Sequence, residues 1–491
     1  MSSLALNLIE ATRRHAEGIA MRLDEVEIPY SGLDSASACL AGLLATHGLL
    51  PGDRVGVMLP NVPYFAVAYY GVLRAGGVVV PINVLLKARE TSFYLSDSQA
   101  KSIIAWHEFA PAARAAATAT GAECIVVTPG QFEELIGAAE PVAEPFPRED
   151  DDTAVILYTS GTTGTPKGAE LTHANLRRNA AMAVETVDLA ADDVILGALP
   201  LFHVFGQTGA LNAAVAAGSC LTLIPRFDPA KALEIIERDH VTVFEGVPTM
   251  FAAMLHSDKR SDTASLRLCI SGGAAMSVEL MRGFEEAFGC MVLEAYGLSE
   301  TSPLASFNHP DGERKPGSIG TPVTGVEMKL VNVSEDGVGE IAIRGHNVMK
   351  GYWNRPDATA AAIDGDGWFH TGDLARVDDD GYYFIVDRSK DMIIRGGYNV
   401  YPREVEEVLY EHPAVREAAV VGIPDDMLGE EVGAAVALMS GAEADAAAIR
   451  DFVKDRVAGY KYPRRVWFVD ELPKGPTGKI LKRDIAIPAE E

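Results

Sequence analysis

Short apolar runs alternate with helix-like stretches between residues 220 and 299. The apolar runs predict strands, and the stretches between them carry apolar residues at helical spacing. Strands that alternate with helices form a parallel sheet with helices packed on its faces, which places the chain in the α/β class. The expected strands are 220–225, 241–245, 266–271 and 291–295, and the expected helices are 229–239, 248–255 and 278–288.

Loops rich in small and polar residues follow three of the expected strands. Two of them are 271–274 and 296–301, and the third follows the apolar run 154–158, ahead of a helix that begins near Thr172. Ligands of parallel sheets bind beyond the carboxyl ends of the strands. We therefore expect the three loops to face one crevice.

The third loop lies within the sequence YTSGTTGTPKG at 158–168. Its glycines let backbone N–H groups approach an anion, its hydroxyl groups add donors, and Lys167 adds a positive charge. The loop therefore predicts phosphate binding. A Walker A loop is excluded because Gly168 follows the lysine, where that motif requires Ser or Thr to hold the metal.

The rest of the chain divides by pattern into three parts. Residues 1–150 alternate strands and helices, 316–387 carry short strands punctuated by Gly and Asp turns, and the residues beyond 390 mix strands with helices. The expected strands are 54–59, 78–81, 327–331, 340–344, 382–386, 392–394, 415–421, 431–438 and 466–469, and the expected helices are 64–74, 402–410 and 446–457.

These parts predict two domains. The first is a large N-terminal domain, 1–389, of parallel sheets with helices, which includes a small antiparallel barrel-like subdomain at about 316–387. The second is a small mobile α+β C-terminal domain, 390–491. The proline-rich, acidic tract 140–152 predicts a solvated connection without a catalytic role.

Charge and cysteine content limit the function classes. The net charge of −27 argues against nucleic acid, because a surface that binds a duplex must neutralise phosphates with Lys and Arg. The five cysteines include no Cys-x-x-Cys pair, which predicts reduced, buried thiols and no zinc site. No signal peptide is visible, and the apolar tract 194–224 is interrupted by polar residues, so we expect a cytoplasmic protein without a membrane span. The sequence leaves a homodimer open.

Several separated motifs occur in one order along nearly the whole chain, from about residue 40 to 483. They are YTSGTTGTPKG (158–168), LPLFHVFG (199–206), YGLSET (296–301), GYWNRPDAT (351–359), DGWFHTGDL (366–374), DGYYFIVDRSKDMIIRGGYNVYPREVE (380–406) and LPKGPTGKILKR (472–483). With these motifs the chain resembles the adenylate-forming superfamily, which includes acyl-CoA synthetases, aryl-CoA ligases, luciferase and adenylation domains.

The resemblance implies a reaction in two steps. A carboxylate oxygen attacks the α-phosphorus of ATP to give an acyl-adenylate and pyrophosphate, and a thiol then displaces AMP to form a thioester. The substrates would be a carboxylic acid, ATP and CoA, with Mg²⁺ as the metal. Because two anions meet in the first step, the protein must supply cations and donors where charge develops.

The resemblance also implies roles for individual residues in nucleotide binding. Glu300 and Thr159 would hold Mg²⁺, Tyr296 and Gly297 would adjoin adenine, Asp373 would accept from the ribose hydroxyls, and Arg388 would meet the ribose or phosphates. The nucleobase slot would be lined by Gly272, Gly273 and Ala274, and the β- and γ-phosphates would contact Thr159, Ser160, Gly161, Thr162, Thr163, Gly164 and Lys167.

Three further expectations concern catalysis and the thiol step. Lys479 would bridge the carboxylate and the α-phosphate, and His203 would border the acyl pocket. A rotation of the C-terminal domain about a hinge at Lys390 would remove Lys479 and bring Gly396 and Gly397 to the site. For the CoA 3′-phosphate, the basic candidates are Lys461, Arg464 and Arg465.

The sequence favours an acyl-CoA ligase for a medium- or long-chain fatty acid, because the segments beside His203 are apolar and lack an obvious second arginine for another carboxylate. The alternatives are a ligase for an aryl or small dicarboxylic acid and an adenylating enzyme that loads a carrier protein. A regulatory nucleotide-binding protein that has lost catalysis is disfavoured, because Lys479, Glu300 and Asp373 are all present.

Overall fold

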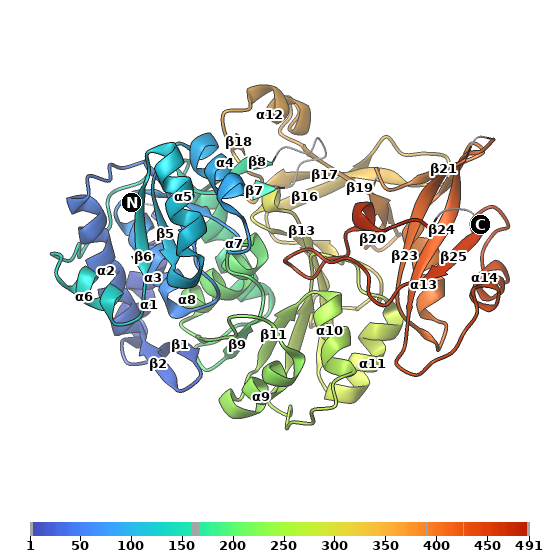
Figure 1. The fold of residues 1–491 in the computed structure, drawn as a ribbon, viewed down its shortest axis with the longest axis horizontal. Helices are drawn as coiled ribbons and strands as arrows, with labels where there is room; N and C mark the ends of the chain where they lie inside the picture. Colours follow the sequence, from blue (N-terminus) through green and yellow to red (C-terminus); the bar gives the residue numbers. More distant parts are fainter. Residues whose placement is uncertain (1–2, 160–165, 389, 426, 489–491) are drawn as a thin grey trace.

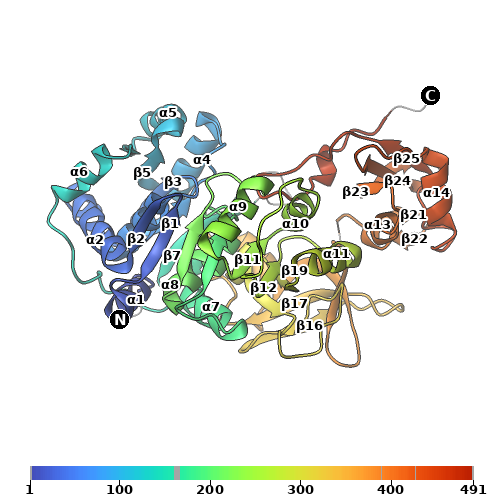
Figure 2. The same ribbon diagram turned by 90° about the horizontal axis from the view of Figure 1, so that it is seen from below.

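The computed structural model describes residues 3–159, 166–388, 390–425 and 427–488. Within these residues the strands form four sheets (Figures 1 and 2). Two large sheets make up most of the N-terminal part, a four-stranded antiparallel sheet follows, and the last sheet belongs to a separate C-terminal domain. The α/β class predicted from the sequence is confirmed.

The first large sheet is parallel through its centre, with antiparallel strands at both ends. Its strands in spatial order are β15 (Thr321–Pro322), β14 (Leu304–Phe307), β13 (Met291–Gly297), β12 (Leu268–Ser271), β11 (Val243–Gly246), β9 (Val194–Gly197), β10 (Cys220–Leu223), β1 (Ile19–Leu23) and β2 (Val26–Pro29).

The second large sheet is parallel from β7 to β6 and antiparallel at its other edge. In spatial order it contains β18 (Gly351–Tyr352), β8 (Lys167–Thr172), β7 (Thr153–Thr159), β4 (Val78–Pro81), β3 (Arg54–Met58), β5 (Ala100–Trp106) and β6 (Glu123–Val127).

The two smaller sheets come from the last third of the chain. The antiparallel sheet contains β16 (Val326–Val331), β17 (Gly339–Gly345), β19 (Phe369–Val377) and β20 (Tyr383–Arg388). The C-terminal sheet contains β22 (Tyr398–Val400), β21 (Ile393–Arg395), β24 (Gly429–Leu438) and β23 (Val415–Asp425), with β25 (Arg465–Phe468) parallel to β24.

Helices cover the sheets. The α-helices are α1 (Leu6–His15), α2 (Tyr30–Thr46), α3 (Pro63–Arg74), α4 (Ala88–Ser98), α5 (Ala110–Thr120), α6 (Gln131–Gly137), α7 (His173–Thr186), α8 (Ala213–Ala217), α9 (Pro229–Asp239), α10 (Pro248–Leu255), α11 (Val278–Phe288), α12 (Pro356–Ala362), α13 (Pro402–Tyr410) and α14 (Ala446–Lys454). Short 3₁₀ turns are η1 (His107–Phe109), η3 (Ser299–Thr301) and η4 (Lys482–Asp484), and a π-helix, η2, spans Gly206–Asn212.

The hydrophobic cores follow this division. One large core joins both big sheets through α2, α3 and α7, and a second lies between the first sheet and α9, α10 and α11. The C-terminal domain has its own core, in which β21, β23 and β24 pack against α13 and α14. The separate core is what allows that domain to be a distinct unit.

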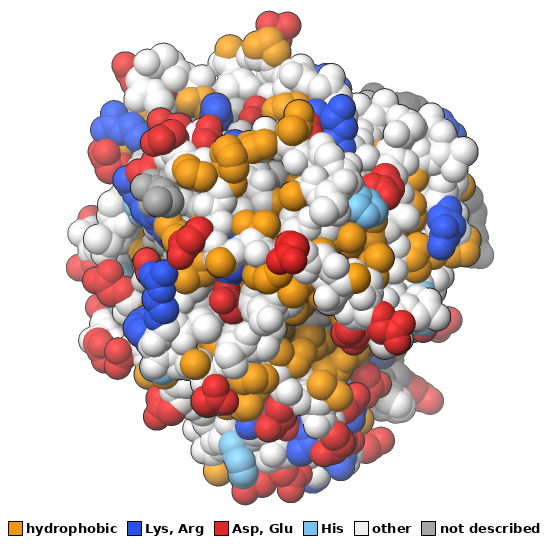
Figure 3. All heavy atoms as spheres, turned by 90° about the vertical axis from the view of Figure 1, so that its left-hand side faces the viewer, with side chains coloured by type: hydrophobic (Ala, Val, Ile, Leu, Met, Phe, Trp, Pro, Cys, Tyr) orange, Lys and Arg blue, Asp and Glu red, His pale blue; other side chains and the backbone are white. Residues whose placement is uncertain are grey.

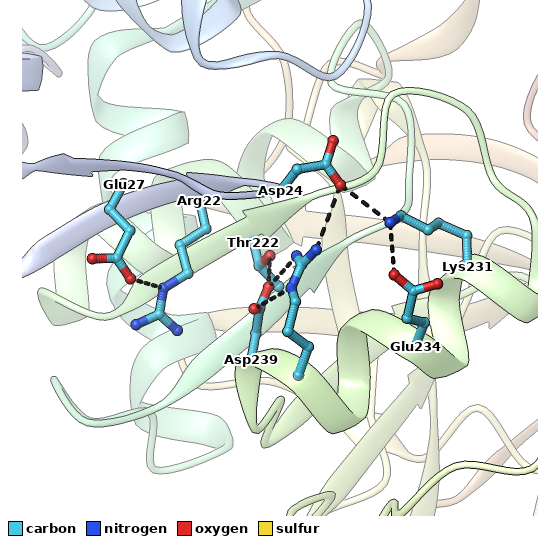
Figure 4. A network of polar contacts seen from close by, with 8 residues as sticks. Arg22, Asp24, Glu27, Thr222, Lys231, Glu234 and Asp239 are labelled. Atoms are coloured by element: carbon cyan, nitrogen blue, oxygen red, sulfur yellow. Dashed lines mark hydrogen bonds and ion pairs between the residues drawn. The ribbon is translucent and has the colours of Figure 1, made fainter.

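Polar contacts attach the hairpin β1–β2, at one edge of the first large sheet, to α9 (Figure 4). Asp24 in the hairpin turn lies 3.2 Å from the Lys231 amine and 3.5 Å from the Arg238 guanidinium, both on α9. Arg238 also pairs with Asp239, which accepts a hydrogen bond from Thr222 on β10. These contacts tie the hairpin to a helix far away in the sequence.

Figure 3 shows the face formed by the N-terminal part of the chain. Lys and Arg side chains stand among Asp and Glu side chains there, and hydrophobic side chains form bands between the charged ones. All five cysteines carry free thiols; three are buried, and Cys39 and Cys124 are only partly buried. No helix in the described part of the chain is long and apolar enough to cross a membrane.

Several strands were missed by the sequence reading, and β8 and β19 are the two that carry residues of predicted function. The segment before Thr172 is the strand β8, which folds back on β7 in antiparallel register, and its Lys-Gly start conceals it. The segment around Asp373 is the strand β19, and it includes Gly372, which has a φ of 74°. The three polar loops also follow strands of two different sheets, not of one.

Replacing Arg74 should destabilise the N-terminal part strongly. The Arg74 side chain is 1% exposed, pairs with Asp34, and donates to the carbonyl groups of Val142 and Ala143. Arg74→Leu leaves these acceptors unpaired, so we expect a loss of about 3 kcal/mol of unfolding free energy. Chemical denaturation measures it.

Arg13→Leu is the matched control, because the Arg13 side chain is 65% exposed and lies 3.8 Å from Glu144. We expect a change within about 0.5 kcal/mol for this variant. Equal losses in both variants would contradict the stabilising role assigned to Arg74.

Candidate active site

A cavity of about 790 Å³ lies where the two large sheets, the antiparallel sheet and the loop 475–481 meet. The ends of β7, β12 and β13 supply Thr159, Gly272, Gly273 and the segment 296–300 to its wall. The expected convergence of the three strand ends on one crevice is therefore confirmed for the described residues. Ser160, Gly161, Thr162, Thr163 and Gly164 lie outside the described residues.

One side of the cavity holds a chain of polar contacts between strands of two sheets. The Tyr296 hydroxyl on β13 donates to Asp373 Oδ2 on β19 over 2.7 Å, and the Arg388 guanidinium on β20 lies 3.2 Å from Asp373 Oδ1. Asp373 is 5% exposed. Both carboxylate oxygens are thus oriented by protein partners, and each retains capacity to accept from a ligand hydroxyl.

A second polar group gathers around Glu300 on η3. Glu300 Oε1 accepts from the Tyr352 hydroxyl over 2.8 Å and lies 3.5 Å from Thr159 Oγ1. The Lys167 amine lies 5.2 Å from the centre of the Tyr352 ring. Tyr352 therefore contacts both the Lys167 amine and the Glu300 carboxylate. The sequence analysis did not name Tyr352 as a site residue, although it noted the motif GYWNRPDAT that contains it.

The donors at Glu300 fit a hard cation. Mg²⁺ prefers oxygen ligands and takes few of them from protein when phosphates are present. The Glu300 carboxylate and the Thr159 hydroxyl are such oxygens. Within the described residues no cluster of three or more His, Cys, Asp or Glu could hold a metal ion by itself, so further ligands would come from phosphate and water.

Lys479 reaches the cavity on a tight loop of the C-terminal domain. The loop closes on itself through the bond from Gly475 N–H to Lys479 O, and Gly478 O accepts from the Thr249 hydroxyl at the start of α10. Gly478 has φ of 80°, and a Cβ there would approach Thr249 and Val247 to 3.0 Å or less. A glycine is therefore required for the loop to dock this closely.

The environment of Lys479 lowers the pKa of its amine to about 8. Burial is the main cause, and the Arg388 guanidinium adds to it, while Asp373 and Asp391 act in the opposite direction. Because no carboxylate in the described part of the chain forms an ion pair with the Lys479 amine, this partly buried cation is available to pair with an anionic ligand.

His203 lies at the same wall of the cavity, at the start of the segment that leads into η2. Burial and the nearby Lys479 charge lower its pKa to about 4, so the imidazole is neutral at neutral pH. Its Nδ1 accepts from Phe205 N–H over 3.3 Å, which leaves the proton on Nε2. His203 therefore offers a donor, not a charge, to the cavity.

The glycine candidates differ in what they do. Gly272 and Gly273 line the cavity, and a Cβ on Gly272 would meet the Phe205 ring at 2.9 Å. Ala274 lines an adjoining pocket of about 410 Å³, which shares Tyr296, Asp373 and Lys479 with the main cavity. Gly297 lines the cavity too, and a Cβ on it would meet Pro303 O at 1.7 Å, so packing alone requires this glycine.

Gly396 and Gly397 do not line this cavity. They form the two-residue turn between β21 and β22, with φ of 55° and 85°. Such a turn needs positive φ at both positions, which favours paired glycines in any hairpin of this kind. In this structure the two glycines thus lie outside the cavity that Lys479 enters. Lys390, which follows β20 in the chain, does line that cavity.

The remaining part of the cavity is mostly apolar and extends between the first large sheet and α7. Its wall includes Ala183, Val187, Leu189, Ile195, Val243 and Ile270. Glu245 on β11 interrupts this apolar wall; it is 5% exposed, and burial raises its pKa to about 8. The sequence reading missed Glu245, because a strand of four to five residues does not reveal which face borders a cavity.

Comparison with known proteins agrees with this architecture. The family described as AMP-binding enzyme matches residues 8–353, and the family described as AMP-binding enzyme C-terminal domain matches residues 404–479. A long-chain-fatty-acid–CoA ligase of Bacillus subtilis (strain 168) is 38% identical, over 97% of this chain and 92% of the relative. A feruloyl-CoA synthase of an Amycolatopsis species is also 38% identical, over 97% of each chain.

A solved structure extends the comparison to three dimensions. ATP-bound MatB from Rhodopseudomonas palustris superposes with a TM-score of 0.92 at 34% identity, over 98% of this chain and 97% of that chain. The apo form of the same protein superposes with a TM-score of 0.83. The chain therefore belongs to the AMP-binding enzymes, the adenylate-forming superfamily, and is an acid–thiol ligase of the acyl-CoA synthetase type.

Proposed function

We propose that this ligase activates a medium- or long-chain fatty acid as its acyl-adenylate and transfers the acyl group to CoA. The observation that carries the proposal is the position of Lys479. It enters the cavity from the C-terminal domain beside Asp373 and Arg388, and no carboxylate of the described residues is held against it by an ion pair or a hydrogen bond.

In the first step a carboxylate oxygen attacks the α-phosphorus of ATP, and the bond to the bridging oxygen of pyrophosphate breaks. Lys479 lies between the two anions and stabilises the charge that develops on the phosphoryl oxygens. Asp373, oriented by Tyr296 and Arg388, accepts from the ribose hydroxyls. The adenine occupies the slot beside Tyr296, Gly272 and Gly273.

The pyrophosphate end of ATP faces the polar group around Glu300. Lys167 and Thr159 would contact the phosphates. Glu300 and Thr159 would hold Mg²⁺, which would supply positive charge to neutralise the phosphates. Tyr352 orients the Glu300 carboxylate through their 2.8 Å hydrogen bond.

In the second step the CoA sulfur attacks the acyl carbonyl carbon, and AMP leaves with the electron pair of the broken ester bond. The thiol proton passes to solvent. We propose that the domain 390–491 rotates about Lys390 before this step, which withdraws Lys479 and brings Gly396 and Gly397 to the pantetheine arm. The better superposition on ATP-bound than on apo MatB supports an adenylation arrangement for the present structure.

The apolar wall beside α7 supports an acid with a hydrocarbon body. The relative that acts on long-chain fatty acids supports a fatty acid, and the feruloyl-CoA synthase supports an aryl acid at the same identity. The apolar composition of the wall leads us to place the fatty acid first.

Lys479→Ala should separate the two half-reactions. Acyl-adenylate formation is expected to fall by about 10²–10³-fold, the scale for removal of one transition-state donor. Thioester formation from supplied acyl-adenylate should stay within about threefold of the wild type. Rapid-quench assays of each half-reaction measure this, with the exposed Lys454→Ala as control. Equal losses in both half-reactions would contradict the proposed division.

The pH dependence of adenylation should follow the Lys479 amine. Because its pKa is about 8 in the free enzyme, the charged form is lost as the pH rises through 8. We expect kcat/KM for ATP to decrease above this pH, since kcat/KM reports the groups of the free enzyme. Any residual activity of Lys479→Arg should lack this decrease. A wild-type profile that stays flat to pH 10 would argue against a catalytic charge on Lys479.

A series of saturated acids tests the proposed substrate class. Each buried CH₂ contributes about 0.8 kcal/mol, so kcat/KM should rise about fourfold per added carbon until the pocket ends. Pyrophosphate release with C2 to C18 acids measures the series, with benzoate and malonate as comparisons. A flat series, or a preference for benzoate or malonate, would exclude the fatty acid.

A further inference from the structure

Glu245 is a buried carboxyl group in the wall of the acyl part of the cavity. It is 5% exposed, and no hydrogen bond or ion pair reaches its carboxyl group from the described part of the chain; its Oε2 is fully buried as well. Val243 precedes it on the same face of β11, and Ile270 is its register partner on β12. One polar group thus interrupts a hydrocarbon surface.

The opposing π-helix η2 leaves room for this carboxyl group. A Cβ on Gly209 would come within 2.7 Å of Glu245 Oε2, so a larger residue there would displace the carboxyl group from its present position. Thr208, the preceding residue of η2, also lines the cavity, and its buried hydroxyl has no partner among the described residues. Departures from α-helical pairing of this kind are frequent at functional sites.

One aromatic side chain adjoins both the nucleotide slot and the helix that faces Glu245. The Phe205 ring lies within van der Waals distance of the ideal Cβ positions of Gly272, in the wall of the slot, and of Gly209, in η2.

A structural role does not account for Glu245. Buried polar groups in native proteins are normally hydrogen-bonded, and an unpaired one costs stability. No neighbouring charge contributes to its raised pKa, which comes from burial alone. An apolar side chain of the same size would fill the space without this cost, so the carboxyl group is better explained by a ligand that supplies the missing partner.

We infer that Glu245 determines substrate specificity by accepting a hydrogen bond from a hydroxyl or amino group on the acyl part of the carboxylic acid. The inference rests on the proposed ligase function and deepens it, because the acid would carry a hydrogen-bond donor on its hydrocarbon part. A site built to pair a donor rejects the analogue that lacks it, because the buried protein group is then left unpaired.

The test compares matched acids. Benzoate is compared with its 2-, 3- and 4-hydroxy and amino derivatives, and hexanoate with its hydroxy and amino derivatives, by AMP formation with the full-length enzyme, ATP, Mg²⁺ and CoA. We expect at least one donor-bearing acid to exceed its parent acid by tenfold or more in kcat/KM. Glu245→Met should reverse this preference, because the parent acid then meets an apolar wall.

Glu245→Gln distinguishes the two kinds of donor. Its carbonyl still accepts from a hydroxyl group but no longer neutralises an ammonium group, so a hydroxy acid should keep its advantage and an amino acid should lose it. Glu294→Gln is the matched control: Glu294 is also buried, with a pKa raised to about 7, but it lines the adjoining pocket. This control should leave the acid preference unchanged.

Stability provides a second measurement that does not depend on turnover. Without ligand, Glu245→Met should melt at a higher temperature than the wild type, because it removes an unpaired buried carboxyl group. A lower melting temperature would indicate a structural role and overturn the inference. So would a wild-type preference for every parent acid, or a preference that Glu245→Met leaves unchanged. Absence of AMP with every acid would instead overturn the proposed function, and this inference with it.

Discussion

The proposed first step depends on placing one cation between two anions, and a loop of the C-terminal domain carries that cation. Backbone bonds close the turn that bears Lys479, and Gly478 O in this turn accepts a hydrogen bond from Thr249 on α10. A glycine at this contact allows the close approach. The proposed withdrawal of Lys479 before the thiol step would break this contact.

The fixed part of the site is built differently. Tyr296, Asp373 and Arg388 come from β13, β19 and β20 and are connected by direct hydrogen bonds and an ion pair. Strands position side chains more rigidly than loops do, so Asp373, the proposed ribose acceptor, is oriented by its protein partners alone. The cavity therefore combines a wall built on strands with a lysine carried by a loop of the C-terminal domain.

Helices were predictable where local chemistry marks their ends. Asp228 caps α9 ahead of Pro229, Ser277 caps α11, and the bounds of both helices agree with the sequence reading. The strands β8 and β19 were missed because Lys, Gly and Asp are poor strand formers, and only pairing with a neighbouring strand makes these segments extended.

The site residues likewise divide into those that the sequence could predict and those that it could not. Lys479, Asp373 and Glu300 stand in motifs that are legible in the sequence, and the structure brings all three to one cavity. The sequence alone did not identify Glu245 or Tyr352 as site residues. The importance of Tyr352 comes from its contacts with Glu300 and Lys167, and that of Glu245 from an apolar wall assembled from distant segments. Such relationships exist only after the sheets have formed.

The pairing of β1 with β10 in the first large sheet has a consequence for folding during protein synthesis. Met21 on β1 pairs with Leu221 on β10, so a strand near the N-terminus needs a strand that is much later in the sequence as its neighbour in the sheet. During translation the hairpin β1–β2 has to wait, with one edge unpaired, until residues 220–223 have left the ribosome. Pairings so distant in sequence slow folding and expose strand edges meanwhile. The acidic character of the chain, with a net charge of −27, opposes association of such nascent chains with one another.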